Sequence, residues 1–391
     1  MIQRFALKRI QRLGKQFPVV LTFWARQSGK TTLARHFLKG EYFDLEKPSD
    51  QQIFLHDIEY ALRRFKEPLI LDEAQTLPEL FPVLRALIDE QRDKKGRYFL
   101  LGSVNPVLIK QISESLAGRV GICELTPFLY PELKEKNDGI SFEEFWLKGG
   151  VPDATLSNDL VEWQTWQENY IRTFVERDIA RFRLKMSAIQ IRQFMGLLAH
   201  YHGNLFNASE ISKSFGISYH TVNAYLDLLE GHFLVRRLRP FYVNIKKRLV
   251  KSPKFYIRDS GVLHYLLGVS SERMLLESPK RGSSFEGFMI EQIITLEELR
   301  HEGARFYFYR THAGAEINLI VELGPERIGF EFKSAVSLSK NDWRNLKDAI
   351  AEGFIQRGIV IYLGERSFDV AENISIIPAK DYLQQKASFI A

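Results

Sequence analysis

Residues 18–38 read PVVLTFWARQSGKTTLARHFL, and this stretch decides how the first part of the chain folds. Its first six residues are almost all apolar, which predicts a buried strand. From Thr31 to Leu38 the apolar residues return at helical spacing, so we expect a helix there. The polar segment between them contains Gly29 and Lys30. A loop that joins a strand to a helix N-terminus presents backbone N–H groups to an anion, which indicates a phosphate-binding loop.

The loop offers the side chains that such a site needs. Lys30 would reach the β- and γ-phosphate oxygens, and the hydroxyl of Thr31 would bind Mg²⁺. The full pattern has glycine five residues before Gly29, where this chain has Trp24. A tight turn against a nucleotide normally uses a residue without a side chain, so the entry to this loop must be built differently. The candidate nucleotide-binding residues are Arg26, Gln27, Ser28, Gly29, Lys30, Thr31 and Thr32.

A second apolar strand, Leu69 to Leu71, ends in two carboxylates. Asp72 suits the Mg²⁺ shell together with the loop threonine, and Glu73 suits orienting the attacking water. A third strand leads to Ser103 and Asn105, where a polar side chain would sense the γ-phosphate. Strands alternate with helices through residues 17–135, which predicts a parallel sheet with helices on both faces. These signals in order along one sheet predict that ATP binds with Mg²⁺.

A helix-turn-helix pattern follows in the middle of the chain. Asn207 to Ser218 reads as a short helix and a glycine turn, and Tyr219 to Glu230 as a second helix. Two short strands follow, which suggests a winged helix. Nine basic residues and no acidic one lie from Arg236 to Arg258, a footprint expected for binding the DNA backbone. Asp227 and Glu230 favour the alternative, a winged helix that mediates protein contacts. The DNA-binding candidates are Arg236, Arg237, Arg239, Lys246, Lys247, Arg248 and Lys251.

The last third of the chain carries a hairpin pattern. Ala315 to Glu322 and Ile328 to Lys333 read as its two strands, with Glu331 and Lys333 on one face, and the preceding helix carries Glu286. This arrangement resembles the restriction-endonuclease-like, PD-(D/E)xK nuclease fold. The resemblance implies a divalent metal held by the acids and a lysine that stabilises the developing charge.

One residue of this pattern differs from the nuclease arrangement. Asn318 stands where the metal-binding aspartate is expected, and an amide carries no charge, so metal affinity should fall. Glu316 lies on the same face of the strand and would compensate in part. The alternative is a polar, solvated face of a hairpin. We therefore expect an inactive or weak nuclease site.

Short motifs along nearly the whole chain point to a known family. They are Arg26–Leu33, Leu71–Gln75, Leu77–Leu80, Glu114–Arg119, Gly149–Pro152, Glu176–Asp178, Lys247–Lys254 and Arg258–Gly261. Together they resemble the prokaryotic AAA-type ATPases that carry an uncharacterised C-terminal region. The resemblance implies an AAA-type core in which Arg119 acts as an arginine finger on a neighbouring subunit, and hence a homo-oligomer. The alternative is a surface arginine favoured by the dipole at a helix C-terminus.

Composition limits the remaining possibilities. The chain has 391 residues, enough for several domains, and a net charge of +6 with a pI of about 9.1, which suggests a polyanionic partner. Its single cysteine, Cys123, excludes an internal disulfide framework and a cysteine-based zinc site. No apolar stretch is long enough to span a membrane, so we expect a cytoplasmic protein without a membrane partner.

The expected fold is α/β. A P-loop, AAA-type parallel sheet precedes a helical and winged-helix module and a small α/β nuclease-like domain. We expect an ATPase core at 1–145, a helical linker or lid at 146–200, a winged helix at 201–270 and the nuclease-like domain at 280–391. The expected function is ATP binding and hydrolysis on or with DNA. The alternatives are a non-hydrolysing, nucleotide-gated adaptor for DNA or protein with degenerate ATPase and nuclease sites, and a metal-dependent nuclease.

Overall fold

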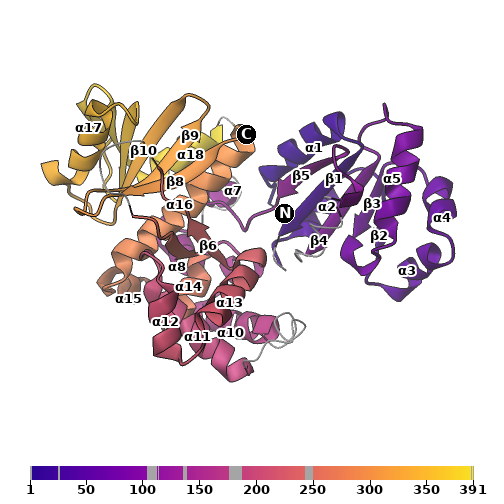
Figure 1. The fold of residues 1–391 in the computed structure, drawn as a ribbon, viewed down its shortest axis with the longest axis horizontal. Helices are drawn as coiled ribbons and strands as arrows, with labels where there is room; N and C mark the ends of the chain where they lie inside the picture. The colour runs from indigo at the N-terminus through magenta and orange to yellow at the C-terminus, as the bar shows by residue number, and fades with distance from the viewer. Residues whose placement is uncertain are drawn as a thin grey trace. The chain divides into compact units, whose positions relative to one another are not determined.

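The computed structural model of the chain describes residues 2–24, 27–103, 112, 114–134, 139–175, 187–242, 250–388 and 390. Contacts between residues divide the chain into two units, shown in Figure 1. The N-terminal unit contains Met1–Phe128 and Gly231–Phe233, and the C-terminal unit contains Leu129–Glu230 and Leu234–Ala391.

The described part of the N-terminal unit is built on a five-stranded sheet in the order β2-β3-β4-β1-β5, and all neighbours are parallel (Figure 1). The strands are β1 (Val19–Trp24), β2 (Glu41–Asp44), β3 (Leu69–Asp72), β4 (Tyr98–Ser103) and β5 (Val120–Glu124). The helices are α1 (Ala6–Gln16), α2 (Lys30–Phe37), α3 (Pro48–Leu55), α4 (Ile58–Arg64) and α5 (Leu80–Glu90), with a 3₁₀ turn η1 (Ala74–Thr76). The predicted parallel sheet is confirmed.

The register of this sheet positions the candidate site. Trp24 at the end of β1 lies beside Ser103 at the end of β4, and Asp44 at the end of β2 lies beside Asp72 at the end of β3. The strands β1, β3 and β4 are apolar and buried along most of their length, as expected for a sheet covered on both faces. The polar residues that follow these strands therefore gather at one edge of the sheet.

The C-terminal unit begins with helices. They are α7 (Tyr130–Lys134), α8 (Phe142–Lys148), α9 (Pro152–Thr155), α10 (Leu160–Thr173), α11 (Ala188–Tyr201), α12 (Ala208–Phe215), α13 (Tyr219–Gly231), α14 (Ser260–Leu266) and α15 (Glu272–Glu277). Gly216 ends α12 in the left-handed conformation (φ 66°), so a glycine turn joins α12 to α13 as predicted. The strands β6 (Val235–Leu238) and β7 (Lys254–Ile257) come between α13 and α14 and form an antiparallel pair.

The C-terminal unit ends in a mixed sheet. In the described part of the chain this sheet has six strands, in the order β12-β13-β11-β10-β9-β8. They are β8 (Arg305–Arg310), β9 (Glu316–Leu323), β10 (Glu326–Lys333), β11 (Arg357–Tyr362), β12 (Phe368–Ala371) and β13 (Ile374–Pro378). The accompanying helices are α16 (Arg281–Arg300), η4 (Lys340–Trp343), α17 (Arg344–Ala351) and α18 (Ala379–Ser388). The predicted hairpin is confirmed as β9 and β10. No helix of the described chain is long and apolar enough to cross a membrane.

Candidate functional site

A hydroxyl and a carboxylate meet at the carboxyl edge of the parallel sheet. Thr31 Oγ1, in the first turn of α2, donates a hydrogen bond of 2.6 Å to Asp72 Oδ2, at the end of β3. Asp72 is only 1% exposed, and its Oδ1 accepts the backbone N–H of Glu73 at 2.9 Å. A hydroxyl beside one buried carboxylate is the kind of hard oxygen donor set that suits Mg²⁺ bound with phosphates. The structure thus brings together the two residues predicted to share the metal.

The loop before α2 has the geometry of an anion site. Gln27 and Gly29 both have left-handed backbone conformations, with φ of 64° and 87°. Lys30 is 6% exposed and Ser28 1% exposed, whereas Gln27 and Thr32 are exposed. The buried Oγ of Ser28 has no hydrogen-bond partner among the described residues. A buried ammonium and a buried, unsatisfied hydroxyl at a helix N-terminus fit phosphate oxygens. Arg26 lies outside the described residues.

Tyr42 contacts the metal-site carboxylate, although the sequence pattern does not select it. It lies on the edge strand β2, and its hydroxyl donates 2.7 Å to Asp72 Oδ2. Burial raises the pKa of the Tyr42 phenol, and the hydrogen bond to Asp72 raises it further, so the phenol stays a donor. The guanidinium of Arg35, on α2, lies 4.5 Å from the centre of the ring. Tyr42 therefore holds the Asp72 oxygen that Thr31 also contacts, while the backbone of Glu73 holds the other oxygen.

Arg4 is a second contact to the site that sequence reasoning missed. Its buried guanidinium donates to the carbonyl of Ser28 at 3.0 Å and to the carbonyls of Thr126 and Pro127 at 2.6 and 2.9 Å. It also lies 4.9 Å from the ring centre of Phe128. Arg4 thereby ties the phosphate-binding loop to the segment after β5. Because its partners are backbone carbonyls, no residue pattern signals this role.

The structure describes some of the predicted catalytic residues fully and others only in part or not at all. Glu73 directly follows β3 in a left-handed conformation (φ 53°), and its carboxylate accepts a hydrogen bond from the amide of Gln75. The backbone of Ser103 lies beside that of Trp24. The side chain of Ser103 and all of Asn105 lie outside the described residues. The predicted role of Glu73 in orienting the attacking water stays a prediction.

The basic run is compensated by acids from elsewhere in the C-terminal unit. Arg236 and Arg258 both bind the carboxylate of Glu291, on α16, with N–O distances of 3.0 and 2.8 Å to Oε2. Arg237 binds Glu230 and Asp227, each at 2.7 Å. The run contains no acidic residue in the sequence, but acidic side chains from outside the run contact its arginines in the structure. It therefore offers less open positive charge than the sequence suggests.

The remaining DNA candidates divide into two groups. Arg239 and Lys251 are exposed, and the segments that carry them lie along the edge of β8 that is not paired with β9. The carbonyl of Arg239 accepts the N–H of Phe308 at 3.0 Å, and the N–H of Val250 donates to the carbonyl of Arg310 at 3.1 Å. The second group lies outside the described residues and comprises Lys246, Lys247 and Arg248.

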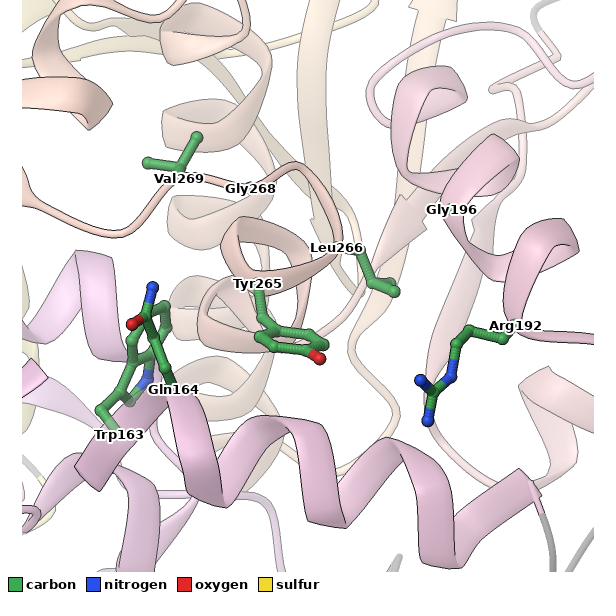
Figure 2. A pocket seen from close by; sticks show the side chains of 8 residues that line it. All are labelled: Trp163, Gln164, Arg192, Gly196, Tyr265, Leu266, Gly268 and Val269. Carbon is green, nitrogen blue, oxygen red and sulfur yellow. The ribbon is translucent and has the colours of Figure 1, made fainter. Parts of the chain in front are cut away.

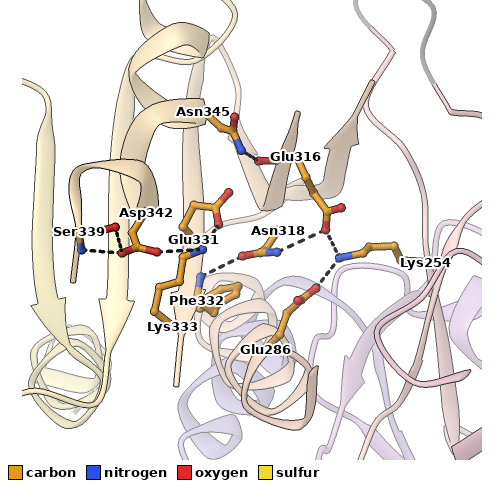
Figure 3. A network of polar contacts seen from close by, with 10 residues as sticks. All are labelled: Lys254, Glu286, Glu316, Asn318, Glu331, Phe332, Lys333, Ser339, Asp342 and Asn345. Carbon is orange, nitrogen blue, oxygen red and sulfur yellow. Dashed lines mark hydrogen bonds and ion pairs between the residues drawn. The ribbon is translucent and has the colours of Figure 1, made fainter. Parts of the chain in front are cut away.

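The nuclease-like residues form one polar cluster, drawn in Figure 3. Lys333 Nζ lies 3.5 Å from Glu331 Oε2, so these two side chains share a face of β10 as predicted. The amide oxygen of Asn318 accepts the backbone N–H of Phe332 at 3.0 Å. Glu286, on α16, joins the cluster through Lys254, whose Nζ donates to its Oε1 at 2.6 Å. The structure brings the four predicted residues together, but it adds a lysine that sequence reasoning missed.

Burial sets the charge of this cluster. Glu331 is 5% exposed, and burial raises its pKa to about 8. Lys333 opposes this shift, while the nearby carboxylates of Glu286 and Glu316 add to it. The carboxyl group of Glu331 is therefore largely protonated at neutral pH.

Comparison with known proteins places the whole chain. A family model for an AAA domain matches residues 16–134, and models for two domains of unknown function, DUF8612 and DUF4143, match residues 139–273 and 281–382. Uncharacterized protein Rv2008c of Mycobacterium tuberculosis is 37% identical over 384 residues, which cover 97% of this chain and 84% of that protein. The chain belongs to this family of AAA-type P-loop ATPases.

The family extends to distant prokaryotes. An uncharacterized protein of Haemophilus influenzae is 26% identical over 281 residues, covering 68% of this chain and 66% of that protein. Uncharacterized protein MJ1544 of Methanocaldococcus jannaschii is 24% identical over 316 residues, covering 73% of this chain and 67% of that protein. These more distant relatives match 68% and 73% of this chain, and the AAA-type assignment itself rests on the domain model for residues 16–134.

Solved structures give weaker likenesses. A crystal structure titled DNA replication initiation factor is 12% identical and covers 55% of this chain and 69% of its own, with a TM-score of 0.24. Protein VC1899 from Vibrio cholerae is 12% identical and covers 95% of this chain and 97% of its own, with a TM-score of 0.20. At such TM-scores these likenesses carry no argument about this AAA-type ATPase.

Arg119 lies at the other edge of the AAA-domain sheet. Its carbonyl accepts the N–H of Val19, the first residue of β1, at 3.2 Å, so it stands at the amino ends of the strands. Its guanidinium binds Asp89 through two contacts of 2.8 Å. The phosphate-binding loop lies at the carboxyl ends. Arg119 is thus placed away from the loop of its own unit, and its finger role in a neighbouring subunit stays a prediction.

A separate pocket of about 360 Å³ lies among the helices of the C-terminal unit (Figure 2). Figure 2 shows the side chains of Arg192 and Tyr265 pointing toward each other across it. Burial raises the pKa of the Tyr265 phenol. The residues that line it are Trp163, Gln164, Arg192, Gly196, Tyr265, Leu266, Gly268 and Val269. Since none of these is a predicted site residue, the pocket is distinct from the sites of the AAA domain and the polar cluster.

Tyr42→Phe tests whether the phenol positions Asp72. The change removes one hydrogen bond to a charged oxygen, so we expect a roughly tenfold higher Mg²⁺ concentration for half-maximal nucleotide-dependent activity. Nucleotide binding without Mg²⁺ should not change. The measurement is a Mg²⁺ titration at saturating ATP, with Tyr60→Phe, at an exposed tyrosine on α4, as the matched control. Equal Mg²⁺ requirements in the two variants would contradict the role.

Proposed function

We propose that this protein binds ATP with Mg²⁺, hydrolyses it and acts on or with DNA. The observation that carries the proposal is the contact between Thr31 and Asp72 beside the buried Lys30, at the start of the helix that follows β1. A P-loop site needs this combination of hydroxyl, carboxylate and ammonium at the carboxyl edge of a parallel sheet.

Each residue has a distinct task in the proposed reaction. Lys30 and the backbone N–H groups of the loop bind the phosphate oxygens and offset their charge. Thr31 and Asp72 would hold Mg²⁺, which when bound neutralises charge on the β- and γ-phosphates. Glu73 accepts a hydrogen bond from the attacking water and aims its oxygen at the γ-phosphorus, while the bond from this phosphorus to the ADP oxygen breaks. Arg119 would add positive charge only to the site of a neighbouring copy.

The DNA part of the proposal is supported by the middle of the C-terminal unit. The helices α12 and α13 and the strand pair β6–β7 follow each other as in a winged helix. Arg239 and Lys251 are exposed, lie along the edge of β8 that is not paired with β9, and can contact phosphates. Such contacts bind the backbone without reading sequence. We therefore propose a largely sequence-independent interaction with DNA.

Replacing Arg239 and Lys251 together with serine tests this interaction. Loss of two phosphate contacts should weaken DNA binding about tenfold or more near 0.1 M salt and lower the salt-dependence slope by roughly 2. The measurement is fluorescence anisotropy of labelled duplex DNA at several salt concentrations. Arg237→Ser is the matched control, because carboxylates of Glu230 and Asp227 already bind this guanidinium. If the control loses as much affinity as the double variant, the assignment fails.

A second candidate function is a nucleotide-gated adaptor that binds ATP but does not turn it over. Trp24 in place of the loop glycine favours it, and so does the hydrogen bond that engages the Glu73 carboxylate with Gln75. The compensated charges of Arg236 and Arg237 also fit a protein partner better than DNA. Phosphate release separates the two candidates, because only the first produces it.

A further inference from the structure

The side chain of Lys254 belongs to the nuclease-like cluster, although Lys254 does not lie on the β9–β10 hairpin. It is the first residue of β7, yet its side chain is 2% exposed and ends between α16 and β9 (Figure 3). Its Nζ donates to Glu286 Oε1 at 2.6 Å and also binds Glu316 Oε1. Tyr256, on the same strand, donates its hydroxyl to Glu286 Oε1 at 2.5 Å. The two carboxylates that face each other across this point are thus joined by an ammonium.

The other polar groups of the cluster also have partners. Lys333 Nζ lies 3.5 Å from both Glu331 Oε2 and Asp342 Oδ1, and Arg310 Nη1 lies 3.0 Å from Glu316 Oε2. Asn318 uses its amide oxygen on the backbone of β10. Among the carboxylate and amide oxygens of this cluster, within the described residues, only Oε1 of Glu331 is buried without a hydrogen-bond partner.

We propose that the Lys254 ammonium is the resident cation of this acidic cluster, so that the cluster takes no divalent metal and cleaves no DNA. A divalent ion needs several oxygens converging at roughly 2.0–2.6 Å, and the point where Glu286 and Glu316 converge is filled. The described residues contain no group of three or more His, Cys, Asp or Glu side chains arranged to hold a metal ion. The metal implied by the nuclease resemblance therefore does not fit the residues present.

The ion pairs of Lys254 with Glu286 and Glu316 also connect two segments of the C-terminal unit. Lys254 belongs to the segment matched by one domain model, residues 139–273, and Glu286 and Glu316 to the segment matched by the next, residues 281–382. Separating the two segments would take the buried Lys254 ammonium away from the two partly buried carboxylates that bind it, which is costly. The cluster thus holds β7 against α16 and β9. This role does not depend on ATP or on the proposed ATPase activity.

Mn²⁺ binding to the full-length chain without nucleotide tests the proposal. Electron paramagnetic resonance counts bound Mn²⁺ in the wild type, in Lys254→Met and in Lys251→Met, an exposed lysine three residues away. Lys254→Met removes the ammonium from the point where the Glu286 and Glu316 carboxylates converge. A cation can then bind there, so we expect Lys254→Met to bind one more Mn²⁺ than the wild type. Lys251→Met should match the wild type, and adding Glu316→Gln to Lys254→Met should remove the new site. A folded Lys254→Met without the extra ion overturns the proposal.

A second comparison decides the matter if Lys254→Met does not fold. Glu286→Gln should bind as many Mn²⁺ ions as the wild type, because the proposal assigns no metal to this carboxylate. One ion fewer in Glu286→Gln would overturn it. So would Mn²⁺-dependent cleavage of plasmid DNA by the wild type that is lost in Lys333→Ala. Both measurements omit ATP, so their failure is distinguishable from failure of the ATPase proposal.

Discussion

Glu73→Gln should bind ATP as tightly as the wild type and release phosphate at least about a hundredfold more slowly. The amide keeps the size and the hydrogen bond to Gln75 but cannot accept the proton of the attacking water as a carboxylate does. Asp72 and Thr31, which define the metal site, are untouched, so binding should persist. The measurement pairs fluorescent-nucleotide titration with single-turnover phosphate release.

The control for this variant is Glu79→Gln, an exposed carboxylate that follows the same 3₁₀ turn. It should hydrolyse ATP at the wild-type rate. If Glu73→Gln also keeps the wild-type rate, Glu73 does not orient the water. If it loses ATP binding instead, the residue supports the fold of the loop rather than the reaction.

Glu291→Ala should destabilise the C-terminal unit by roughly 3–5 kcal/mol, because it removes the buried carboxylate that Arg236 and Arg258 both bind. Burial by itself raises the pKa of Glu291, but the two guanidinium groups outweigh burial and lower it, so the carboxylate is charged in the folded chain. Urea unfolding followed by tryptophan fluorescence reports mainly on this unit, since four of the five tryptophans lie in it.

Glu277→Ala is the matched control for this loss. Glu277 pairs with Arg273 one helical turn away on α15, and both side chains are exposed, so the change should cost less than about 1 kcal/mol. Equal losses in the two variants would contradict the buried network. Equal losses of stability would also make Arg236 a candidate for contacting DNA again.

The fold of the N-terminal unit was predictable where local pattern and burial agree. The apolar runs that became β1, β3 and β4 are buried strands, and the helix expected from Thr31 to Leu38 is α2, with bounds Lys30–Phe37. The strand β2 was missed because EYFD is short, half polar and lies at the sheet edge. No strand was expected after Lys333, although β11 contains the apolar run Ile359 to Tyr362.

The candidate site was predictable only where a local motif marks it. The loop and the β3 carboxylates are short patterns, and the sheet register brings Thr31 and Asp72 together. Tyr42 and Lys254 act through partners 30 to 62 residues away in the chain. Tertiary packing brings such distant residues together, and a single sequence does not show which of them will be in contact. For the same reason the run from Arg236 to Arg258 looked free of acids.

The central claim is ATP hydrolysis coupled to DNA. Phosphate release from Mg²⁺-ATP by the full-length protein, measured with and without duplex DNA, tests it most directly. We expect phosphate release that DNA accelerates and that Lys30→Ala abolishes. Tight ATP binding with no phosphate release in either condition would contradict it and support the adaptor.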